Sequence, residues 1–343
     1  MLRFNPMDFE TPDQLVRYLR AKGHVGPGEK PAVHCLPGGV SNRTFLVRRR
    51  DGEDWVIKQA LPQLRVATAW FSSPARSHAE AMALRWLPKL APPDTIPGLV
   101  FEDPENHLLA MRAVPLPHEN WKTLLLNGHL VEEHVRQFAT LLGCIHRSSS
   151  ERKNELLPIF QDQSFFESLR LEPYYAYTAS QLPDTAAFLN CLIHATRQQR
   201  DCLVHGDYSP KNVLVHAGRL VLLDHEVIHF GEPAFDLGFS LTHLLSKAHY
   251  LPAHRRSFVN AAHLFWRSYL QAAAPCHQTA DFESRAARHT LACLLARVAG
   301  RSTLEYFCAD HRRAQQQVVL QLIPGRPQTI TELIDSFASH LPT

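Results

Sequence analysis

The sequence predicts an α+β protein with two lobes, an N-terminal antiparallel sheet with a helix and then a mostly helical C-terminal lobe. Residues 33–60 contain strand-type apolar runs, residues 76–90 repeat apolar side chains at helical spacing, and the helical period dominates from about residue 130. A chain of 343 residues with 45% hydrophobic content can bury a core in each lobe. We place the lobes at residues 1–115 and 116–343.

The N-terminal lobe is expected to begin with a helix, because Thr11 is a favourable N-cap and Pro12 suits the first helical position. Two further strands are predicted over residues 99–102 and 107–112, which meet at a turn. Residues 111–115 then form the predicted hinge between the lobes.

In the C-terminal lobe, residues 131–146 carry apolar side chains at helical spacing. Residues 237–272 and 285–299 show the same helical pattern. Residues 213–215 and 220–223 are strand-type runs joined by a short turn, which predicts a β-hairpin.

The residues with the clearest chemistry are Asp207, Asn212 and Asp224. Asp207 stands five residues before Asn212, and Asp224 stands twelve residues beyond Asn212, as in a protein-kinase-like catalytic loop followed by a metal-binding aspartate. In phosphoryl transfer to a hydroxyl, an aspartate accepts the hydroxyl proton, and amide and carboxylate oxygens hold Mg²⁺. The predicted hairpin would bring Asn212 and Asp224 to the same end, as a shared metal ion requires.

A family resemblance rests on three motifs in order, His205-Gly-Asp207, Asp224-His-Glu226 and Phe235-Asp-Leu-Gly238. With Asn212, they resemble the aminoglycoside phosphotransferase and choline kinase superfamily. That resemblance implies a two-lobed protein-kinase-like fold and the phosphorylation of small molecules rather than proteins. The match is specific over residues 203–238, looser upstream and weakest in the last hundred residues.

The resemblance also implies roles for the residues of these motifs. Asp207 would be the catalytic base, and Asn212 and Asp224 would be the ligands of Mg²⁺. Glu226 would be a ligand of a second metal ion, as in the family branches that carry Asp-x-Glu. The chain departs from the family at His225, where an apolar or aromatic residue usually stands.

Two upstream residues fit the same scheme. Lys58 ends the strand-type run Trp55-Val-Ile-Lys58, which resembles the kinase strand whose lysine contacts the nucleotide phosphates. Glu80 lies in the predicted helix over residues 76–90, where the family places the glutamate that pairs with that lysine. Asp236 would support the catalytic loop from the helix that follows it.

The turn over residues 36–42 has two interpretations. It could cover the nucleotide phosphates, or it could be an ordinary hairpin turn. The cofactor-binding residues expected in the first case are Gly38, Gly39, Ser41 and Asn42. The backbone of the hinge, at Met111 and Ala113, would hydrogen-bond the adenine edge. ATP is the expected nucleotide, and GTP is also possible because backbone contacts cannot be read from a sequence.

Two alternatives compete with an active kinase. The chain could be a catalytically inactive, nucleotide-binding relative. It could also be a zinc hydrolase, since His225-Glu226-Val227-Ile228-His229 satisfies the pattern His-Glu-x-x-His. The β-branched Val227 and Ile228 disfavour the helix that this zinc motif needs.

The acceptor is expected to be a small molecule with a hydroxyl group, such as an amino alcohol, a sugar or an aminoglycoside-like compound. Tyr174 and Tyr175 could hold an amine by cation–π contact, whereas Arg297 and Arg301 could hold an anionic or polyhydroxyl acceptor. The same residues could equally pack or face solvent. Without a concentrated acidic cluster near the C-terminus, a polycationic drug is not favoured.

Composition is consistent with a small-molecule enzyme. The net charge of +3 predicts no nucleic-acid partner, and no apolar run reaches membrane-spanning length. The seven cysteines show no Cys-x-x-Cys pair, as expected for free thiols in the cytoplasm. The sequence leaves the oligomeric state open.

Overall fold

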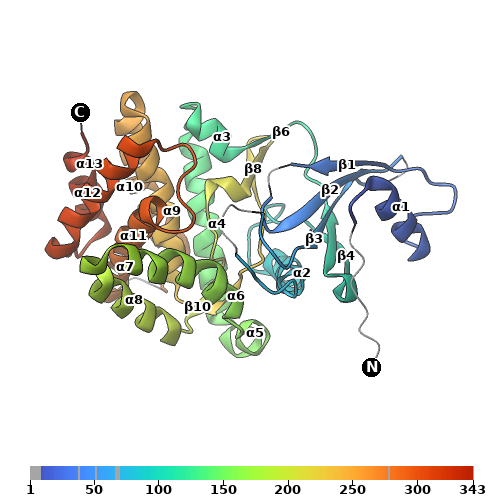
Figure 1. Ribbon diagram of the computed structural model, residues 1–343, viewed down its shortest axis with the longest axis horizontal. Coiled ribbons are helices and arrows are strands. Elements are labelled where there is room, and N and C mark those ends of the chain that lie inside the picture. Colours follow the sequence, from blue (N-terminus) through green and yellow to red (C-terminus); the bar gives the residue numbers. More distant parts are fainter. Residues whose placement is uncertain (1–8, 38, 51, 66–69, 277–278, 343) are drawn as a thin grey trace.

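The computed structural model of the protein describes all residues except 1–8, 38, 51, 66–69, 277–278 and 343. The predicted α+β class is confirmed, with an antiparallel sheet and a helix in the N-terminal region and a mostly helical remainder. Figure 1 shows the N-terminal sheet towards one end of the molecule and most of the C-terminal helices towards the other.

The N-terminal sheet has five antiparallel strands in the spatial order β1-β2-β3-β5-β4. The strands are β1 (Ala32–Leu36), β2 (Asn42–Arg48), β3 (Trp55–Ala60), β4 (Leu99–Asp103) and β5 (Leu108–Arg112). Trp55 and Ile57 of β3 pack into a buried apolar cluster on one face of the sheet. Because strand side chains alternate between faces, Lys58 points to the opposite face.

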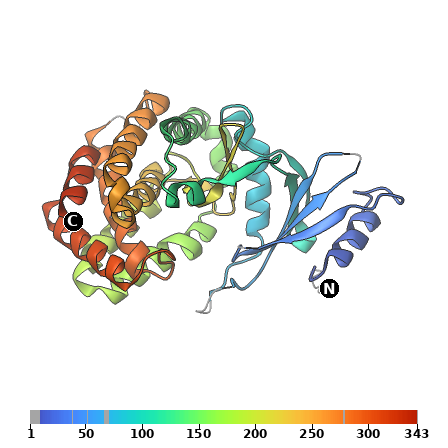
Figure 2. The same cartoon turned by 90° about the horizontal axis from the view of Figure 1, so that it is seen from above.

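Two helices flank this sheet. Helix α1 (Pro12–Ala21) begins as predicted, with Thr11 and Gln14 forming a reciprocal capping box. Helix α2 (Arg76–Trp86) ends before residue 90, and a 3₁₀ turn (Leu87–Lys89) covers the rest of that prediction. Figure 2 shows α1 on the side of the sheet away from the helical body.

The C-terminal region is a packed helical body. Its helices are α3 (Trp121–Leu126), α4 (Glu132–Glu151), α5 (Lys153–Phe160), α6 (Ser164–Phe166), a π-helical segment η3 (Glu167–Ala176), α7 (Tyr177–Gln181), α8 (Ala186–Gln198), α9 (Pro233–Tyr250), α10 (Arg255–Ala273), α11 (Ala280–Ala299), α12 (Ala309–Gly325) and α13 (Ile330–His340). The helical pattern predicted over residues 237–272 is confirmed, but as two helices. It divides into α9 and α10 at Pro252, whose ring cannot donate the helical hydrogen bond.

Short strands lie in the segments that connect these helices. They are β6 (His118–Asn120), β7 (Cys202–Val204), β8 (Val213–His216), β9 (Arg219–Leu222) and β10 (His229–Gly231). The predicted hairpin is confirmed, since β8 and β9 pair with His216 opposite Arg219. Among the described residues, no helix is both long and apolar enough to cross a membrane.

Helices α9 and α11 approach very closely at Gly238. A Cβ atom there would lie 2.5 Å from the backbone carbonyl carbon of His289 and 2.7 Å from the nitrogen of Thr290. Only a residue without a side chain fits between the two backbones. The contact fixes α11 against the helix that carries Asp236.

Candidate active site

A cleft of about 1720 Å³ lies between the N-terminal sheet and the helical body. Most of the predicted site residues line it, namely Gly39, Ser41, Asn42, Lys58, Met111, Ala113, Asp207, Asn212, Asp224 and Glu226. Glu80 lies directly behind Lys58, and Gly38 is outside the described residues. Residues that are far apart in the sequence thus meet in one cleft.

Lys58 lies between two carboxylates. Its Nζ is 2.7 Å from Oε1 of Glu80 and 2.7 Å from Oδ1 of Asp224. Burial raises the pKa of Glu80, although the charge of Lys58 opposes the shift. Burial would also raise the pKa of Asp224, but the charges of Lys58 and Lys211 outweigh it and hold that pKa well below its ordinary value. Asp224 is therefore ionised at neutral pH.

The predicted catalytic loop is held by Asp236, near the start of α9. Its two carboxylate oxygens accept hydrogen bonds from the backbone N–H groups of His205 (2.7 Å) and Gly206 (2.8 Å). Gly206 adopts a positive φ of 75°, which glycine tolerates without strain. His146 lies 3.3 Å from the same carboxylate and fixes it from the other side. The loop that presents Asp207 is therefore anchored to two helices.

Asp207 is oriented through one of its oxygens. Oδ2 accepts from Nδ2 of Asn212 at 2.7 Å and lies 2.9 Å from Nη2 of Arg170. Arg170 is buried and also donates to the carbonyl of Gly206 at 2.7 Å. Since both donors engage Oδ2, Oδ1 is the oxygen that an acceptor hydroxyl can approach.

Asn212 and Asp224 are brought together by the base of the β8–β9 hairpin. The backbone N–H of Leu223 donates to the carbonyl of Asn212 at 2.8 Å. Asp224 then adopts a positive φ of 67°, an uncommon conformation outside glycine. Because the side-chain nitrogen of Asn212 is engaged with Asp207, its amide oxygen and the carboxylate of Asp224 offer the oxygen ligands that suit Mg²⁺.

Glu226 has a different environment. Its Oε2 lies 3.0 Å from Nε of Arg76 and accepts from Nδ2 of Asn42 at 3.1 Å. Arg76 is fully buried and also donates to backbone carbonyls of Ser41, Leu61, Ser72 and Ser73. A second metal ion at Glu226 would have to share this carboxylate with a guanidinium.

At the predicted hinge, Ala113 has only one backbone group to offer. Its N–H donates to the carbonyl of Asp54 at 2.8 Å and so extends the pairing of β3 with β5. Met111 pairs with Val56 within the same sheet. A nucleotide could therefore use the carbonyl of Ala113 but not its N–H group.

The zinc motif does not form a zinc site. Residues 225–228 form a turn, and His229 begins strand β10, so the two histidines do not share a helical face. Burial, reinforced by the charges of His205 and Lys58, holds the pKa of His225 well below its ordinary value. In the described part of the chain, no three His, Cys, Asp or Glu side chains are grouped to hold a metal ion.

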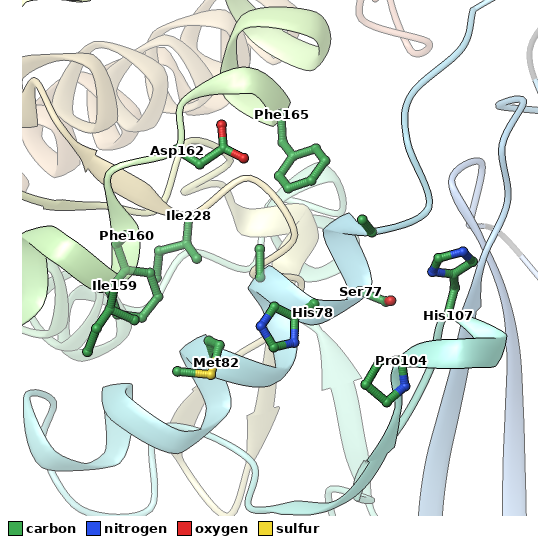
Figure 3. Close-up of a pocket in the computed structure, with 12 residues that line it drawn as sticks. Ser77, His78, Met82, Pro104, His107, Ile159, Phe160, Asp162, Phe165 and Ile228 are labelled. Atoms are coloured by element: carbon green, nitrogen blue, oxygen red, sulfur yellow. The ribbon is translucent and has the colours of Figure 1, made fainter.

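A smaller cavity of about 510 Å³ lies beside helix α2. Figure 3 shows His78 and Met82 of α2 facing Ile159, Phe160 and Ile228 across it. None of the predicted site residues lines it. The larger cleft is therefore the candidate active site.

The chain belongs to the phosphotransferase enzyme family, whose sequence profile matches residues 33–274. This match covers well over half of the chain and includes every predicted site residue. No curated protein matches the chain significantly by sequence.

Solved structures show the same fold at low sequence identity. The amicoumacin kinase hAmiN, solved with AMP-PNP, Ca²⁺ and Ami, matches with a TM-score of 0.60 at 14% identity, covering 93% of this chain and 95% of the other. A choline kinase from Cryptosporidium parvum matches at 0.57 and 11%, covering 92% and 97%. A macrolide 2'-phosphotransferase from Brachybacterium faecium matches at 0.55 and 16%, covering 89% and 97%. At such identities these structures establish the fold alone.

Two arginines of the site received no role from the sequence. Arg76 stands four residues before Glu80 on the same face of α2, but its ion-pair partner Glu226 is distant in sequence. Arg170 contacts Asp207 from a π-helical segment distant in sequence. No local pattern predicts that pair, because only the fold brings the two residues together.

Proposed function

We propose that the protein is an ATP- and Mg²⁺-dependent kinase that phosphorylates a hydroxyl group of a small molecule. The observation that carries the proposal is Asp207, oriented through Oδ2 in the same cleft as the Lys58–Asp224 pair. Membership of the phosphotransferase family supports this reaction class. GTP is kept as an alternative nucleotide.

In this proposal, Asp207 orients the acceptor hydroxyl through Oδ1 and accepts its proton. Lys58 contacts phosphate oxygens of the nucleotide, and Glu80 holds the lysine in place. Asn212 and Asp224 are the proposed ligands of Mg²⁺. The ion would neutralise charge on the phosphate oxygens.

The turn between β1 and β2 is proposed to cover the phosphates with Gly38, Gly39, Ser41 and Asn42. Two arginines hold this turn in place, which supports the proposal. Arg76 donates to the carbonyl of Ser41, and Arg65 donates to the carbonyls of Gly39 (2.8 Å) and Asn42 (2.6 Å). The adenine is proposed to lie beside Met111 and the carbonyl of Ala113.

The proposal extends to organisation and location. We take residues 1–115 as a nucleotide-binding lobe and 116–343 as a catalytic lobe with the acceptor pocket. None of the seven cysteines forms a disulfide, which supports a reducing cytoplasm as the location.

The test is nucleotide- and acceptor-dependent release of ADP or GDP with Mg²⁺, across amino alcohols, sugars, hydroxy acids and sugar phosphates. The matched control is Asp207→Asn, which keeps the size of the side chain and removes the base. Acceptor-dependent release that the variant loses supports the kinase. Tight ATP binding without turnover on any acceptor would instead indicate an inactive relative.

A further inference from the structure

The acceptor end of the cleft contains a buried arginine with no acidic partner. Arg297 of α11 is only 8% exposed and lines the cleft. Its Nη1 donates to the hydroxyl of Tyr174 at 3.0 Å, to Oγ of Ser302 at 2.8 Å and to the carbonyl of Ser302. All three acceptors are uncharged, and Nε has no hydrogen-bond partner among the described residues.

Neighbouring cations of the cleft differ from Arg297 in this respect. Arg301 lies 3.1 Å from a carboxylate oxygen of Glu172, and Lys122 forms an ion pair with Glu305. Within the described residues, no ion pair joins Arg297 to a carboxylate. A buried charge without a counter-charge is costly, so a ligand that supplies a negative charge would be bound favourably there.

Charges of both signs lie near Arg297, namely Lys122 and Lys247 on one hand and the carboxylate of Glu305 on the other. Burial, reinforced by the charges of Lys247 and Arg297, holds the pKa of His243 well below its ordinary value. Burial and then the charge of Lys122 lower the pKa of Lys247 to about 7. Neutral His243 lines the cleft, and Lys247 lies beneath it with its Nζ 3.2 Å from the carbonyl of His243. The guanidinium of Arg297 thus lacks an ion-paired carboxylate among the described residues, which favours an anion over an ammonium group as its ligand.

We propose that the acceptor carries an anionic oxygen group, a carboxylate or a phosphate, which Arg297 binds while Asp207 engages the hydroxyl to be phosphorylated. This inference rests on the proposed kinase function and narrows its substrate class. Arginine suits this role because its planar donors match the oxygens of both groups.

The distance between the two ends limits the size of the acceptor. Arg170, which contacts the proposed base, and Arg297 both lie beside the ring of Tyr174. The guanidinium carbon of Arg170 lies 5.8 Å from the centre of the Tyr174 ring, and that of Arg297 lies 5.7 Å from it. Arg170 in turn contacts Asp207. Asp207 and Arg297 are thus linked through the side chains of Arg170 and Tyr174, which suits a small acceptor.

The experiment compares acceptors that share a polyol backbone and differ in one terminal group and its charge. One series is glycerol, glycerate, glycerol phosphate and aminopropanediol, and a longer series is ribitol, ribonate and ribitol phosphate. Acceptor-dependent ADP release is measured for the wild type, Arg297→Gln, Arg297→Lys and Arg301→Gln. We expect kcat/KM to be highest for one anionic member, and the carboxylate and phosphate arms identify which group is bound.

The variants then locate the anion. Arg297→Gln should raise the KM of that acceptor about 30-fold or more and leave the KM of ATP unchanged, because it removes one partner of a charge pair. Arg297→Lys should recover part of the loss. Arg301→Gln should have a much smaller effect, since Arg301 already has Glu172 as its partner.

Several outcomes would overturn the proposal. A preference for the neutral or cationic member would do so, as would an Arg297→Gln enzyme with an unchanged KM. If ATP binds but no member is phosphorylated, calorimetric titration with inorganic phosphate and acetate decides. If the wild type binds these anions and Arg297→Gln does not, the proposed anion site stands. If the wild type binds neither anion, the proposed site is rejected. Failure to bind any nucleotide would reject the kinase function itself, whatever the anions do.

Discussion

The two ends of the cleft balance their charges differently. At the nucleotide end, Lys58 lies between Glu80 and Asp224, each 2.7 Å away. At the proposed acceptor end, Arg297 is more buried than Lys58 but donates only to uncharged oxygens. On the proposed assignment, the nucleotide end holds its own cation in position, whereas Arg297 depends on a ligand for its counter-charge.

This difference also separates the residues proposed to serve the reaction itself from the residue proposed to select the acceptor. Paired charges preorganise a reaction step, and preorganised charge needs no rearrangement when the reaction occurs. A buried charge that has no charged partner in the protein selects the ligand, because only a ligand of opposite charge offsets the cost of burying it. Catalysis and acceptor choice are therefore assigned to opposite ends, and each assignment can be tested by substitution.

The largest effect is expected at the point where the two ends meet. Asp207→Asn should lower kcat about a thousandfold, since the amide cannot accept the hydroxyl proton. Stopped assays of ADP formation measure the loss, and calorimetry should show ATP binding close to that of the wild type. A kcat within tenfold of the wild type would mean that Asp207 is not the base.

At the nucleotide end, Lys58→Met should lower kcat/KM for ATP about a hundredfold, because it removes a phosphate contact and leaves two carboxylates facing each other. Glu80→Gln should cost about tenfold, since Asp224 still holds the lysine. Steady-state kinetics at saturating acceptor give both numbers. Equal losses in the two variants would instead assign Glu80 a role of its own.

Substitutions in the Arg76–Glu226 ion pair should have smaller effects, and they test whether Glu226 binds a second metal ion. Glu226→Gln should raise the KM of ATP about tenfold, because it loosens the turn that Arg76 holds at Ser41. Arg76→Met should give a similar increase, and the double variant should be no worse than either single one. Magnesium titrations are the discriminating measurement. If Glu226→Gln alone changes the Mg²⁺ dependence, Glu226 is a metal ligand.

The smallest expected effect is on the free energy of unfolding, through Lys247 beneath the proposed acceptor end. The pKa of Lys247 is about 7 in the folded protein and near 10.5 for an ordinary lysine. Between these values the unfolded chain holds a proton that the folded protein does not, so stability rises with pH from about 7 to 10.5.

Lys247→Met removes this contribution. Denaturant unfolding of both proteins at several pH values should show the wild type gaining stability relative to the variant by up to about 1.4 kcal/mol per pH unit. Parallel pH profiles would show that Lys247 is not buried as a neutral amine.

The sequence predicted the fold class and the parts of the site that rest on local spacing. Thr11 and Pro12 begin a helix, and residues 213–222 form the hairpin that joins Asn212 to Asp224, because caps and turns depend on neighbouring residues. Lys58 also meets Glu80 as the resemblance implied.

The rest depends on contacts between distant segments. The bond of Ala113 to Asp54 follows from strand pairing across the sheet, so the sequence could not indicate which hinge group is free. The pair Arg170–Asp207 joins the π-helical segment η3 to the loop that follows β7. Whether Arg297 has an ion-paired carboxylate depends on its surroundings in the folded protein, and these cannot be read from the sequence.

The close approach of α9 and α11 at Gly238 has a consequence for how the enzyme can change. Asp236 on α9 anchors the loop of the base, and Arg297 lies two turns beyond the contact on α11. On the proposed assignment, these two helices therefore hold the groups that would contact opposite ends of the acceptor. Substitutions on the cleft surface would alter which chemical group is recognised, whereas a longer acceptor would require the two helices to separate. Gly238 is thus expected to favour compact acceptors.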